Sequence, residues 1–234
     1  MNINEAKVLI TGGTSGLGYA TAKLLKEHGA TVTICGRHKE KLDKACQELG
    51  VPGKQTDVAN EDEMIDLVSF AIEKMNGLNV LINNAGIGTF APLSSLKSED
   101  FRNIWETNVL GAMVAGREAA KHFIKENTGN IINIASTAGH KGFVNGSAYC
   151  SSKFALVGLT ECWRAELRKH NVRVMMVNPS EVITEFGGNI PDESKDTESK
   201  LKPIEIAHTI LSMLQMNDVG FITEATVWAT NPQS

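Results

Sequence analysis

The sequence predicts a doubly wound α/β fold: a single domain over residues 1–234, with about seven parallel strands in one sheet and helices on both faces. Short runs rich in β-branched residues alternate with amphipathic helical segments along almost the whole chain, and no hairpin turn joins two of the runs. A length of 234 residues is ordinary for one α/β domain, and no stretch of linker composition divides the chain.

Strands are expected at the short apolar runs, and helices where apolar residues recur with a helical period. The apolar residues from Leu17 to Leu25, for example, recur at helical spacing, and Gly29 closes that helix. The expected strands cover 7–11, 31–35, a short run ending at Asp57, 80–82, 130–135, 173–177 and 226–228. The expected helices cover about 17–28, 39–49, 64–75, 98–125, 147–170 and 206–214.

The composition argues against several classes of protein. A net charge of −4 supplies no basic field for a nucleic acid, and no apolar run approaches the roughly 20 residues of a membrane span. The first seven residues contain no apolar signal segment, so secretion is not expected. Four scattered cysteines without a C-x-x-C pair and six histidines without ligand spacing predict neither a disulfide framework nor a metal site. We therefore expect a cytoplasmic protein.

One segment departs from the alternation of strands and helices. Residues 191–202 (PDESKDTESKLK) are polar and charged, without periodicity. This pattern predicts a solvated, mobile loop. Long excursions from compact sheets are often lids over active sites, so residues 185–203 are also expected to form a substrate loop or lid, and both interpretations are compatible.

A glycine-rich turn, TGGTSGLG at 11–18, lies between the first strand and the first helix. Unpaired N–H groups at a helix N-terminus favour phosphate, and glycines let the backbone approach a pyrophosphate closely. The spacing is G-x-x-x-G-x-G, so the generic G-x-G-x-x-G signature is not matched. The position of the turn favours a dinucleotide site in a Rossmann-type fold, whereas a tight connection with positive φ angles is the alternative.

The end of the second strand indicates which dinucleotide. The run Ile34-Cys35-Gly36-Arg37-His38-Lys39 contains no carboxylate to hold both ribose hydroxyls. Arg37, assisted by Lys39, can pair with a 2′-phosphate through charged hydrogen bonds. We therefore expect NADPH (NADP) as the cofactor and consider NADH less favoured; ordinary solvated charges at the start of a helix are the alternative.

Three side chains have the chemistry of proton transfer. Tyr149 and Lys153 stand four residues apart on one helix face, and Ser136 follows the strand at 130–135, where a hydroxyl faces the ligand crevice. An ammonium about 4 Å away at an effective dielectric of about 20 supplies roughly 4 kcal/mol, enough to lower a phenol pKa by about 3 units. We therefore expect Lys153 to lower the pKa of Tyr149, which then acts as the general acid or base. The alternatives are a surface tyrosine and a capping serine.

These motifs together resemble the short-chain dehydrogenase/reductase family, in its short single-domain branch. The resemblance covers essentially the whole chain: TGGTSGLG at 11–18, NNAG at 83–86, Asn108 within TNVLG, Ser136, and YCSSK at 149–153. It implies that Ser136, Tyr149 and Lys153 are the catalytic trio. It also implies that Asn108 completes a proton relay by holding a water near Lys153. The poor helix propensity of asparagine fits a functional role for Asn108.

The resemblance further implies the residues that bind the cofactor. Lys153 also grips the nicotinamide ribose, Asp57 and Val58 contact the adenine, and Asn84-Ala85-Gly86 forms the ribose-side wall, with Asn83 as a structural hydrogen-bonder. The full expected set is Gly12, Thr14, Ser15, Gly16, Leu17, Gly18, Arg37, Asp57, Val58, Asn84, Ala85, Gly86, Tyr149, Lys153, Pro179, Val182 and Thr184. One position departs from the family pattern, because Ser180 follows Pro179 where a glycine is common.

The substrate is less defined than the reaction. Candidate pocket walls are Phe90, Trp105, His140, Phe143, Asn145 and Phe186, each of which is equally compatible with ordinary packing. The ending TVWATNPQS lacks the glycine-rich ending frequent in the family, so ketoreductase activity in fatty-acid synthesis is not carried over. The ending looks more like that of the family's general carbonyl and alcohol reductases.

The sequence thus predicts an NADPH-dependent oxidoreductase that reduces a carbonyl to a secondary alcohol, or catalyses the reverse reaction. The alternative is a catalytically silent protein that binds NADPH as a regulator, although none of Ser136, Tyr149 and Lys153 is missing. A nucleotide-sugar epimerase is disfavoured because no substrate domain follows the sheet. Since the family commonly assembles through its long helices, we expect a homodimer or homotetramer built on the helices at 98–125 and 147–170.

Overall fold

One parallel sheet organises the molecule. The computed structural model describes residues 1–184, 186 and 199–230. Seven strands pair in the order β3-β2-β1-β4-β5-β6-β7, and every pair is parallel. The strands are β1 (Lys7–Ile10), β2 (Thr31–Gly36), β3 (Gly53–Gln55), β4 (Val80–Asn83), β5 (Gly129–Ile134), β6 (Val172–Pro179) and β7 (Glu224–Val227). The predicted doubly wound α/β class is confirmed.

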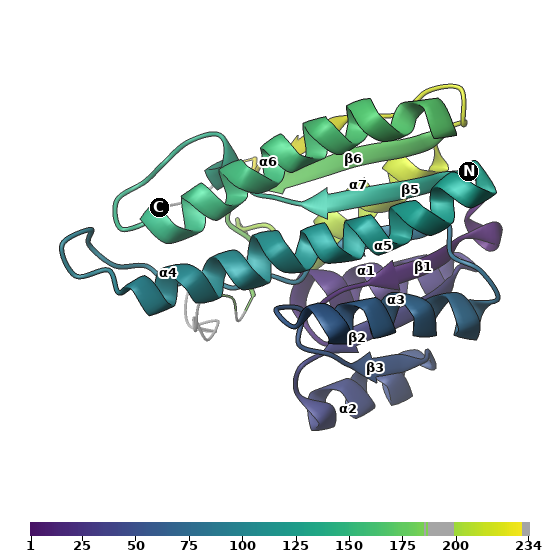
Figure 1. Ribbon diagram of the computed structural model, residues 1–234, viewed down its shortest axis with the longest axis horizontal. Helices are drawn as coiled ribbons and strands as arrows, with labels where there is room; N and C mark the ends of the chain where they lie inside the picture. The colour runs from purple at the N-terminus through teal and green to yellow at the C-terminus, as the bar shows by residue number, and fades with distance from the viewer. Residues whose placement is uncertain (185, 187–198, 231–234) are drawn as a thin grey trace.

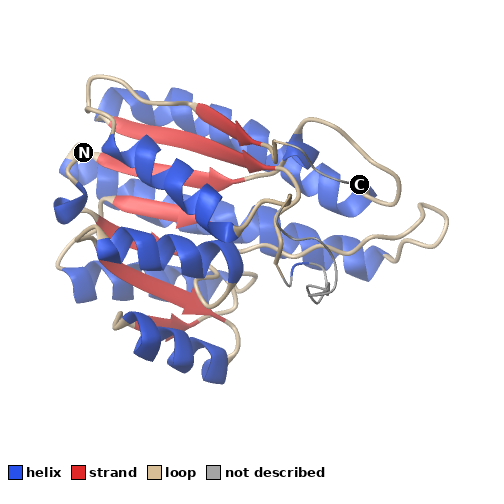
Figure 2. Cartoon of the chain, turned by 180° about the vertical axis from the view of Figure 1, so that it is seen from behind, coloured by secondary structure: helices blue, strands red, loops and turns tan. Residues whose placement is uncertain are grey.

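Helices cover both faces of the sheet. In Figure 1, α3, α5 and α6 lie in front of the strands, and α1 and α7 lie behind them; Figure 2 shows the opposite face. The helices are α1 (Gly16–Glu27), α2 (Lys39–Leu49), α3 (Glu61–Met75), α4 (Ser98–Trp105), α5 (Gly111–Glu126), α6 (Ser147–Leu167) and α7 (Pro203–Gln215). None of the helices in the described part of the chain is long and apolar enough to cross a membrane.

The strands are buried on both faces because their side chains alternate between two cores. In β1, Val8 and Ile10 pack with α1, α2 and α7, whereas Leu9 packs with α3 and α5. Phe123 of α5 is fully buried in the second core. These runs therefore appear in the sequence as continuous apolar segments, which is the pattern that predicted a parallel sheet.

The strand order places a crevice at the carboxyl edge of the sheet. β1 is flanked by β2 on one side and β4 on the other, so the loops that leave β1 and β4 diverge to opposite sides. Ligands of open α/β sheets bind at such a switch point. All strands point the same way in Figure 1, so the loops after β1, β2, β4, β5 and β6 gather at this one edge.

Several element boundaries differ from the sequence-based expectation. The last strand is Glu224–Val227 rather than 226–228, and the third strand ends at Gln55, two residues before Asp57. The helical stretch expected at 98–125 is divided by a π-helical turn, Glu106–Leu110. Most of the expected lid at 185–203 lies outside the described residues. Its far end is held in place, because buried Leu201 pairs with Val182 and Ile183 N–H donates to Leu201 O at 2.9 Å.

Candidate active site

A cleft of about 1720 Å³ runs along the carboxyl edge of the sheet. The loops after β1, β2, β4, β5 and β6 supply most of its walls, and the segment after β3, helix α6 and strand β7 also contribute. Most of the residues expected to bind a cofactor line it: Gly12, Thr14, Ser15, Gly16, Leu17, Arg37, Val58, Asn84, Ala85, Gly86, Tyr149, Lys153, Pro179, Val182 and Thr184. Gly18, Asp57 and Asn108 do not line it.

The glycine turn has the geometry of a phosphate cradle. Gly12 and Gly16 adopt φ angles of +66° and +53°, which residues with a side chain rarely adopt. A Cβ on Gly16 would lie 3.3 Å from Thr184 Cγ2, so the loop after β6 closes directly over this turn. Helix α1 begins at Gly16 and has no acidic residue in its first turn. Its unpaired N–H groups and dipole suit an anion, and the turn therefore fits a pyrophosphate.

Gly18 has a different role from the one expected. A Cβ at this position would lie 2.3 Å from Gly12 O and 2.5 Å from Asn84 Nδ2. Gly18 therefore allows α1 to pack closely against the turn and against the loop after β4, and it does not face the ligand space.

Asn84 and Thr11 fasten the glycine turn to β4. Asn84 Nδ2 donates to Thr11 O and Gly12 O at 2.9 and 3.0 Å. The N–H groups of Asn84 and Ala85 both donate to Thr11 Oγ1 at 3.0 Å. The expected ribose-side wall and the glycine turn are thus one hydrogen-bonded unit. No role for Thr11 was predicted from the sequence, although a hydroxyl at the end of a buried strand was a usable signal.

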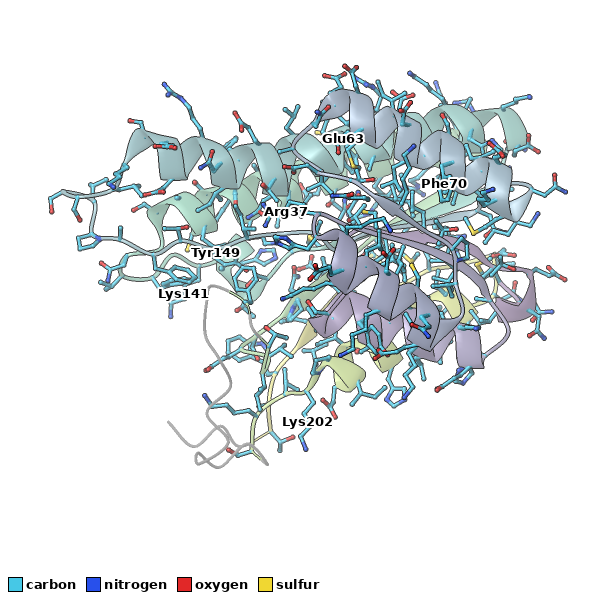
Figure 3. The ribbon with its side chains drawn as sticks, turned by 90° about the horizontal axis from the view of Figure 1, so that it is seen from below. Arg37, Glu63, Phe70, Lys141, Tyr149 and Lys202 are labelled. Carbon is cyan, nitrogen blue, oxygen red and sulfur yellow. The ribbon has the colours of Figure 1, made fainter. Side chains whose placement is uncertain are left out.

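The far end of the cleft carries positive charge. Arg37, His38 and Lys41 line it, and no carboxylate of β2 or of the turn that follows does. Lys39, expected to assist Arg37, instead forms an ion pair with Asp43 on the exposed side of α2. Because α2 begins at Lys39, its helical period turns Lys41, two residues later, toward the cleft. Arg37 and Tyr149 are labelled in Figure 3.

Asp57 does not face the ligand space. Its carboxylate Oδ1 accepts the N–H of Ala59 at 3.0 Å and so caps the turn that leads into α3. Its own N–H donates to Glu63 Oε2 at 2.7 Å. The neighbouring Thr56 and Val58 line the cleft instead, so only Val58 of the two expected adenine contacts faces the ligand space.

Ser136, Tyr149 and Lys153 meet in the middle of the cleft. Ser136 follows β5 and caps a short 3₁₀ turn, Thr137–Gly139, by accepting Ala138 N–H at 3.1 Å. Its hydroxyl hydrogen-bonds the Tyr149 phenol and lies 3.5 Å from Pro179 O. Lys153, one turn further along α6, places Nζ 5.8 Å from the centre of the Tyr149 ring. The three groups expected from the sequence are therefore brought together.

The electrostatics of this group differ from the expectation. Burial raises the pKa of Tyr149, and the hydrogen bond with Ser136 opposes that shift only in part. Burial lowers the pKa of Lys153 from 10.5 to about 8. The predicted lowering of the Tyr149 pKa by Lys153 is not found in the ligand-free protein. The reason is that Lys153 Nζ lies beside the phenol ring and donates to Ile134 O at 2.9 Å.

Asn108 lies behind the cleft in the π-helical turn. Its side chain is fully buried and bonds the backbone of Ile87 in both directions, accepting from N–H at 2.8 Å and donating to O at 3.0 Å. Nδ2 also donates to Ser152 Oγ at 3.0 Å. Asn108 therefore connects the loop after β4 with the first turns of α6, which carry Tyr149 and Lys153. Single π turns inside helices are frequent at functional sites.

The predicted substrate walls divide into two groups. Phe90, Phe143 and Phe186 line the cleft around Tyr149, with ring centres of Phe90 and Phe186 at 5.7 and 5.5 Å from the tyrosine ring. Trp105 does not line the cleft, because its Nε1 donates to Ser151 Oγ at 3.2 Å and its ring stacks on Phe101.

Asn145 also lies outside the cleft lining and is a turn residue. It adopts a φ angle of +66°, and its carbonyl accepts Ala91 N–H at 3.0 Å.

His140 lines the cleft together with three residues that sequence reasoning missed: Glu224, Thr226 and Trp228. Glu224 and Thr226 lie in β7, and Trp228 directly follows it, so the three residues alternate along the strand and share one face. A strand predicted to start at Glu224 would have placed all three on the face toward the cleft. Across the described ranges, no cluster of three or more His, Cys, Asp or Glu residues could hold a metal ion.

A glycine-lined crevice at the switch point of a parallel sheet is the usual site of a dinucleotide, and a serine, a tyrosine and a lysine in it have side chains suited to proton transfer. A family model described as short chain dehydrogenase matches residues 6–195. The 3-oxoacyl-(acyl-carrier-protein) reductase of Thermotoga maritima is 33% identical over 232 residues, covering 94% of each chain. An uncharacterized oxidoreductase of Staphylococcus saprophyticus is 32% identical over 220 residues, covering 89% of each.

Solved structures agree with this match. An alcohol dehydrogenase of the archaeon Thermococcus sibiricus, complexed with 5-hydroxy-NADP, aligns with a TM-score of 0.88 at 26% identity, covering 98% of this chain and 100% of that one. A variant of actinorhodin polyketide ketoreductase with NADPH aligns with a TM-score of 0.87 at 28% identity, covering 98% of each. The chain belongs to the short-chain dehydrogenase family and is an oxidoreductase.

Proposed function

We propose that this protein is an NADPH-dependent oxidoreductase that reduces a carbonyl group to a secondary alcohol, or oxidises the alcohol in the reverse direction. The observation that carries the proposal is the meeting of Ser136, Tyr149 and Lys153 in the middle of the cleft. The names of two similar structures, an alcohol dehydrogenase and a ketoreductase, describe the same chemistry and support it.

Each of the three side chains has a separate task. Ser136 already hydrogen-bonds the phenol of Tyr149, so its hydroxyl is placed to hold the substrate oxygen beside that phenol. Tyr149 keeps its proton at neutral pH because burial raises its pKa, and it donates this proton to the carbonyl oxygen. Lys153 carries a positive charge below about pH 8 and, as the family resemblance implies, holds the nicotinamide ribose next to the phenol. Bound NADPH supplies the hydride.

The choice of NADPH over NADH rests on the positive end of the cleft. Arg37, His38 and Lys41 line this end of the cleft, and arginine pairs with a phosphate through a planar fork of donors. The structures similar to this chain include complexes with NADP or NADPH. The glycine turn, whose positive φ angles leave the backbone open to the ligand, is compatible with the pyrophosphate of either dinucleotide.

Replacing Tyr149 by phenylalanine tests the catalytic assignment. The chain has two tyrosines, so Tyr19→Phe is a matched control that removes the same hydroxyl from an exposed bond to Glu48. We expect Tyr149→Phe to lower kcat by about 10²–10⁴-fold, the usual contribution of a general acid, while NADPH affinity changes less than about threefold. Tyr19→Phe is expected to keep wild-type turnover. Tyr149→Phe activity above about a tenth of wild type contradicts the assignment.

A wild-type protein that binds NADPH tightly but reduces none of a panel of aldehydes, ketones, diketones and ketoesters would instead support the regulatory alternative. The same panel run with NADH tests the cofactor preference. The cytoplasmic location expected from the sequence stays a prediction.

We also propose that the protein is a homodimer or homotetramer assembled through α4, α5 and α6. Exposed apolar side chains on these helices, Phe101, Ile124 and Phe154, support this arrangement. Light scattering at micromolar concentration is expected to give two or four times the 25.3 kDa mass of the chain. A monomeric mass contradicts the proposal.

A further inference from the structure

A carboxylate lies on the wall of the cleft and is held by two neighbours. Glu224 Oε1 accepts a hydrogen bond from Asn178 Nδ2 at 2.5 Å, and His140 Nε2 lies 2.9 Å from the same oxygen. Glu224 and His140 line the cleft with side chains about 40% and 45% exposed, whereas Asn178 is completely buried beneath them. The three residues come from β7, from the turn after β5 and from β6.

This cluster lies next to the reacting groups. Asn178 precedes Pro179, whose carbonyl oxygen lies 3.5 Å from Ser136 Oγ. One residue of β6 therefore connects the cluster with the surroundings of the Ser136 hydroxyl. His140 is likewise connected to Ser136 through the single 3₁₀ turn that Ser136 caps.

Glu224 faces the ligand space because of the register of β7. Ala225 and Val227 pack against the core that α7 covers, so Glu224, Thr226 and Trp228 point to the opposite side, where all three line the cleft. The pairing of Thr226 with Asn178 fixes this register. A polar wall formed by β7 and His140 therefore supplements the phenyl rings of Phe90 and Phe186, which contact Tyr149.

The carboxylate of Glu224 is held in one orientation through one of its two oxygens. Oε1 takes both contacts, and Oε2 has no hydrogen-bond partner in the part of the chain that the structure describes. Asn178 directs its Nδ2 toward Glu224 and leaves its own Oδ1 buried without a partner. Burying the unpaired Asn178 Oδ1 is unfavourable. The Asn178 side chain therefore holds the Glu224 carboxylate at some loss of folding stability. An acceptor fixed in advance binds a donor with little loss of entropy.

We propose that Glu224 accepts a hydrogen bond from a hydroxyl group of the substrate, so that the protein prefers ketones that carry a hydroxyl near the carbonyl, and vicinal diols in the reverse direction. This inference rests on the proposed function and adds the substrate class. A carboxylate has no proton to donate when ionised, so it discriminates in favour of groups that donate a hydrogen bond. Asn178 and His140 are positioning residues that hold the carboxylate.

Three phenyl ketones of similar size test the inference in the wild-type protein with NADPH. α-Hydroxyacetophenone donates a hydrogen bond, α-methoxyacetophenone only accepts one, and propiophenone carries a methyl group in place of the hydroxyl. We expect kcat/KM for the hydroxyketone to exceed both others by about tenfold or more, mainly through KM, because a hydrogen bond to a charged group is at stake. Hydroxyacetone and butanone repeat the comparison without the phenyl group.

Glu224→Gln and its matched control Glu181→Gln test whether the Glu224 carboxylate causes the preference for the hydroxyketone. Glu181 also lines the cleft, but its carboxylate is exposed and pairs with Lys200 at 2.8 Å. In Glu224→Gln, the amide oxygen keeps the contacts with Asn178 and His140, and an NH2 group replaces the free oxygen. We expect this variant to lose about tenfold of the preference for the hydroxyketone over propiophenone, and Glu181→Gln to retain the wild-type ratio.

The outcomes separate the two proposals. Equal efficiency of the wild type with all three ketones overturns the hydroxyl subsite and leaves the proposed function standing. A preference that survives Glu224→Gln also overturns it, since a group elsewhere then recognises the hydroxyl. A wild-type protein that reduces none of the ketones with NADPH overturns the proposed function and this inference together. The wild-type comparison decides the matter even where Glu224→Gln does not fold.

Discussion

Replacing Lys153 by methionine is expected to stabilise the ligand-free protein near neutral pH while it removes a member of the proposed catalytic group. The lysine is 5% exposed, and no carboxylate among the described residues pairs with it. Burial lowers its pKa from 10.5 to about 8, and 2.5 pKa units correspond to about 3 kcal/mol of unfavourable free energy for the charged form. Losing the bond to Ile134 O costs about 1 kcal/mol. The net gain is therefore about 2 kcal/mol.

The pH dependence of this gain has a definite sign. Between about pH 8 and pH 10.5 the unfolded chain holds the Lys153 proton and the native protein does not, so unfolding takes up a proton. Wild-type stability therefore rises by about 3 kcal/mol relative to the methionine variant across this window. The advantage of the variant is complete below about pH 8 and is lost before pH 10.5, where the wild type is expected to be more stable by about 1 kcal/mol.

Urea unfolding of both proteins without cofactor, at several values from about pH 7 to pH 10, measures the difference. Lys23→Met is the control, because Lys23 is an exposed residue of α1 and its substitution is expected to change stability by less than about 0.5 kcal/mol at every pH. Two results refute the reasoning: a Lys153→Met variant less stable than wild type near pH 7, or a stability difference that does not change with pH.

Two further substitutions test the cofactor site. Gly18→Ala is expected to lower stability by about 1–3 kcal/mol in thermal unfolding and to weaken NADPH binding, because its Cβ would meet Gly12 O at 2.3 Å. Gly158→Ala in α6, where a Cβ meets nothing within 4 Å, is the control and is expected to be neutral or stabilising by about 0.5–1 kcal/mol. Arg37→Asp is expected to shift the ratio of kcat/KM from NADPH toward NADH by about tenfold or more, since charged hydrogen bonds to the phosphate are lost. An unchanged ratio means that Arg37 does not meet a 2′-phosphate.

The sequence was sufficient for the sheet because its strands are buried on both faces. Val8, Leu9 and Ile10 face two different cores, and only an unbroken apolar run satisfies both. The start of the last strand was predicted two residues too late because this strand is not buried on both faces. The run Thr226-Val227-Trp228 has high β propensity, but the ladder with Met176–Pro179 begins at Glu224, and pairing decides the boundary.

The sequence could predict which residues lie near the site, but it could not predict which way their side chains point. Residues after parallel strands reach the same edge of the sheet, so Ser136 and Arg37 were found from their place in the sequence. Which way a side chain turns there depends on local bonds. Asp57 turns back to cap Ala59, and Trp105 turns toward Ser151. Neither bond has a sequence pattern that separates it from a ligand contact.

Asn108 illustrates how a residue can serve the site without facing it. The π turn, marked by the bond from Gly111 N–H to Glu106 O, has no sequence signal, and it places the Asn108 amide between Ile87 and Ser152. Ser152 in turn donates to Tyr149 O at 2.7 Å. The buried amide therefore connects a wall of the cleft to the turn of α6 that carries the proposed acid. The three hydrogen bonds of the Asn108 side chain go directly to Ile87 and Ser152. The water-holding role implied by the family resemblance stays a prediction. The hydrogen bonds that this amide makes to Ile87 and Ser152 explain why a poor helix former occupies the position, since they hold the segment that carries Tyr149.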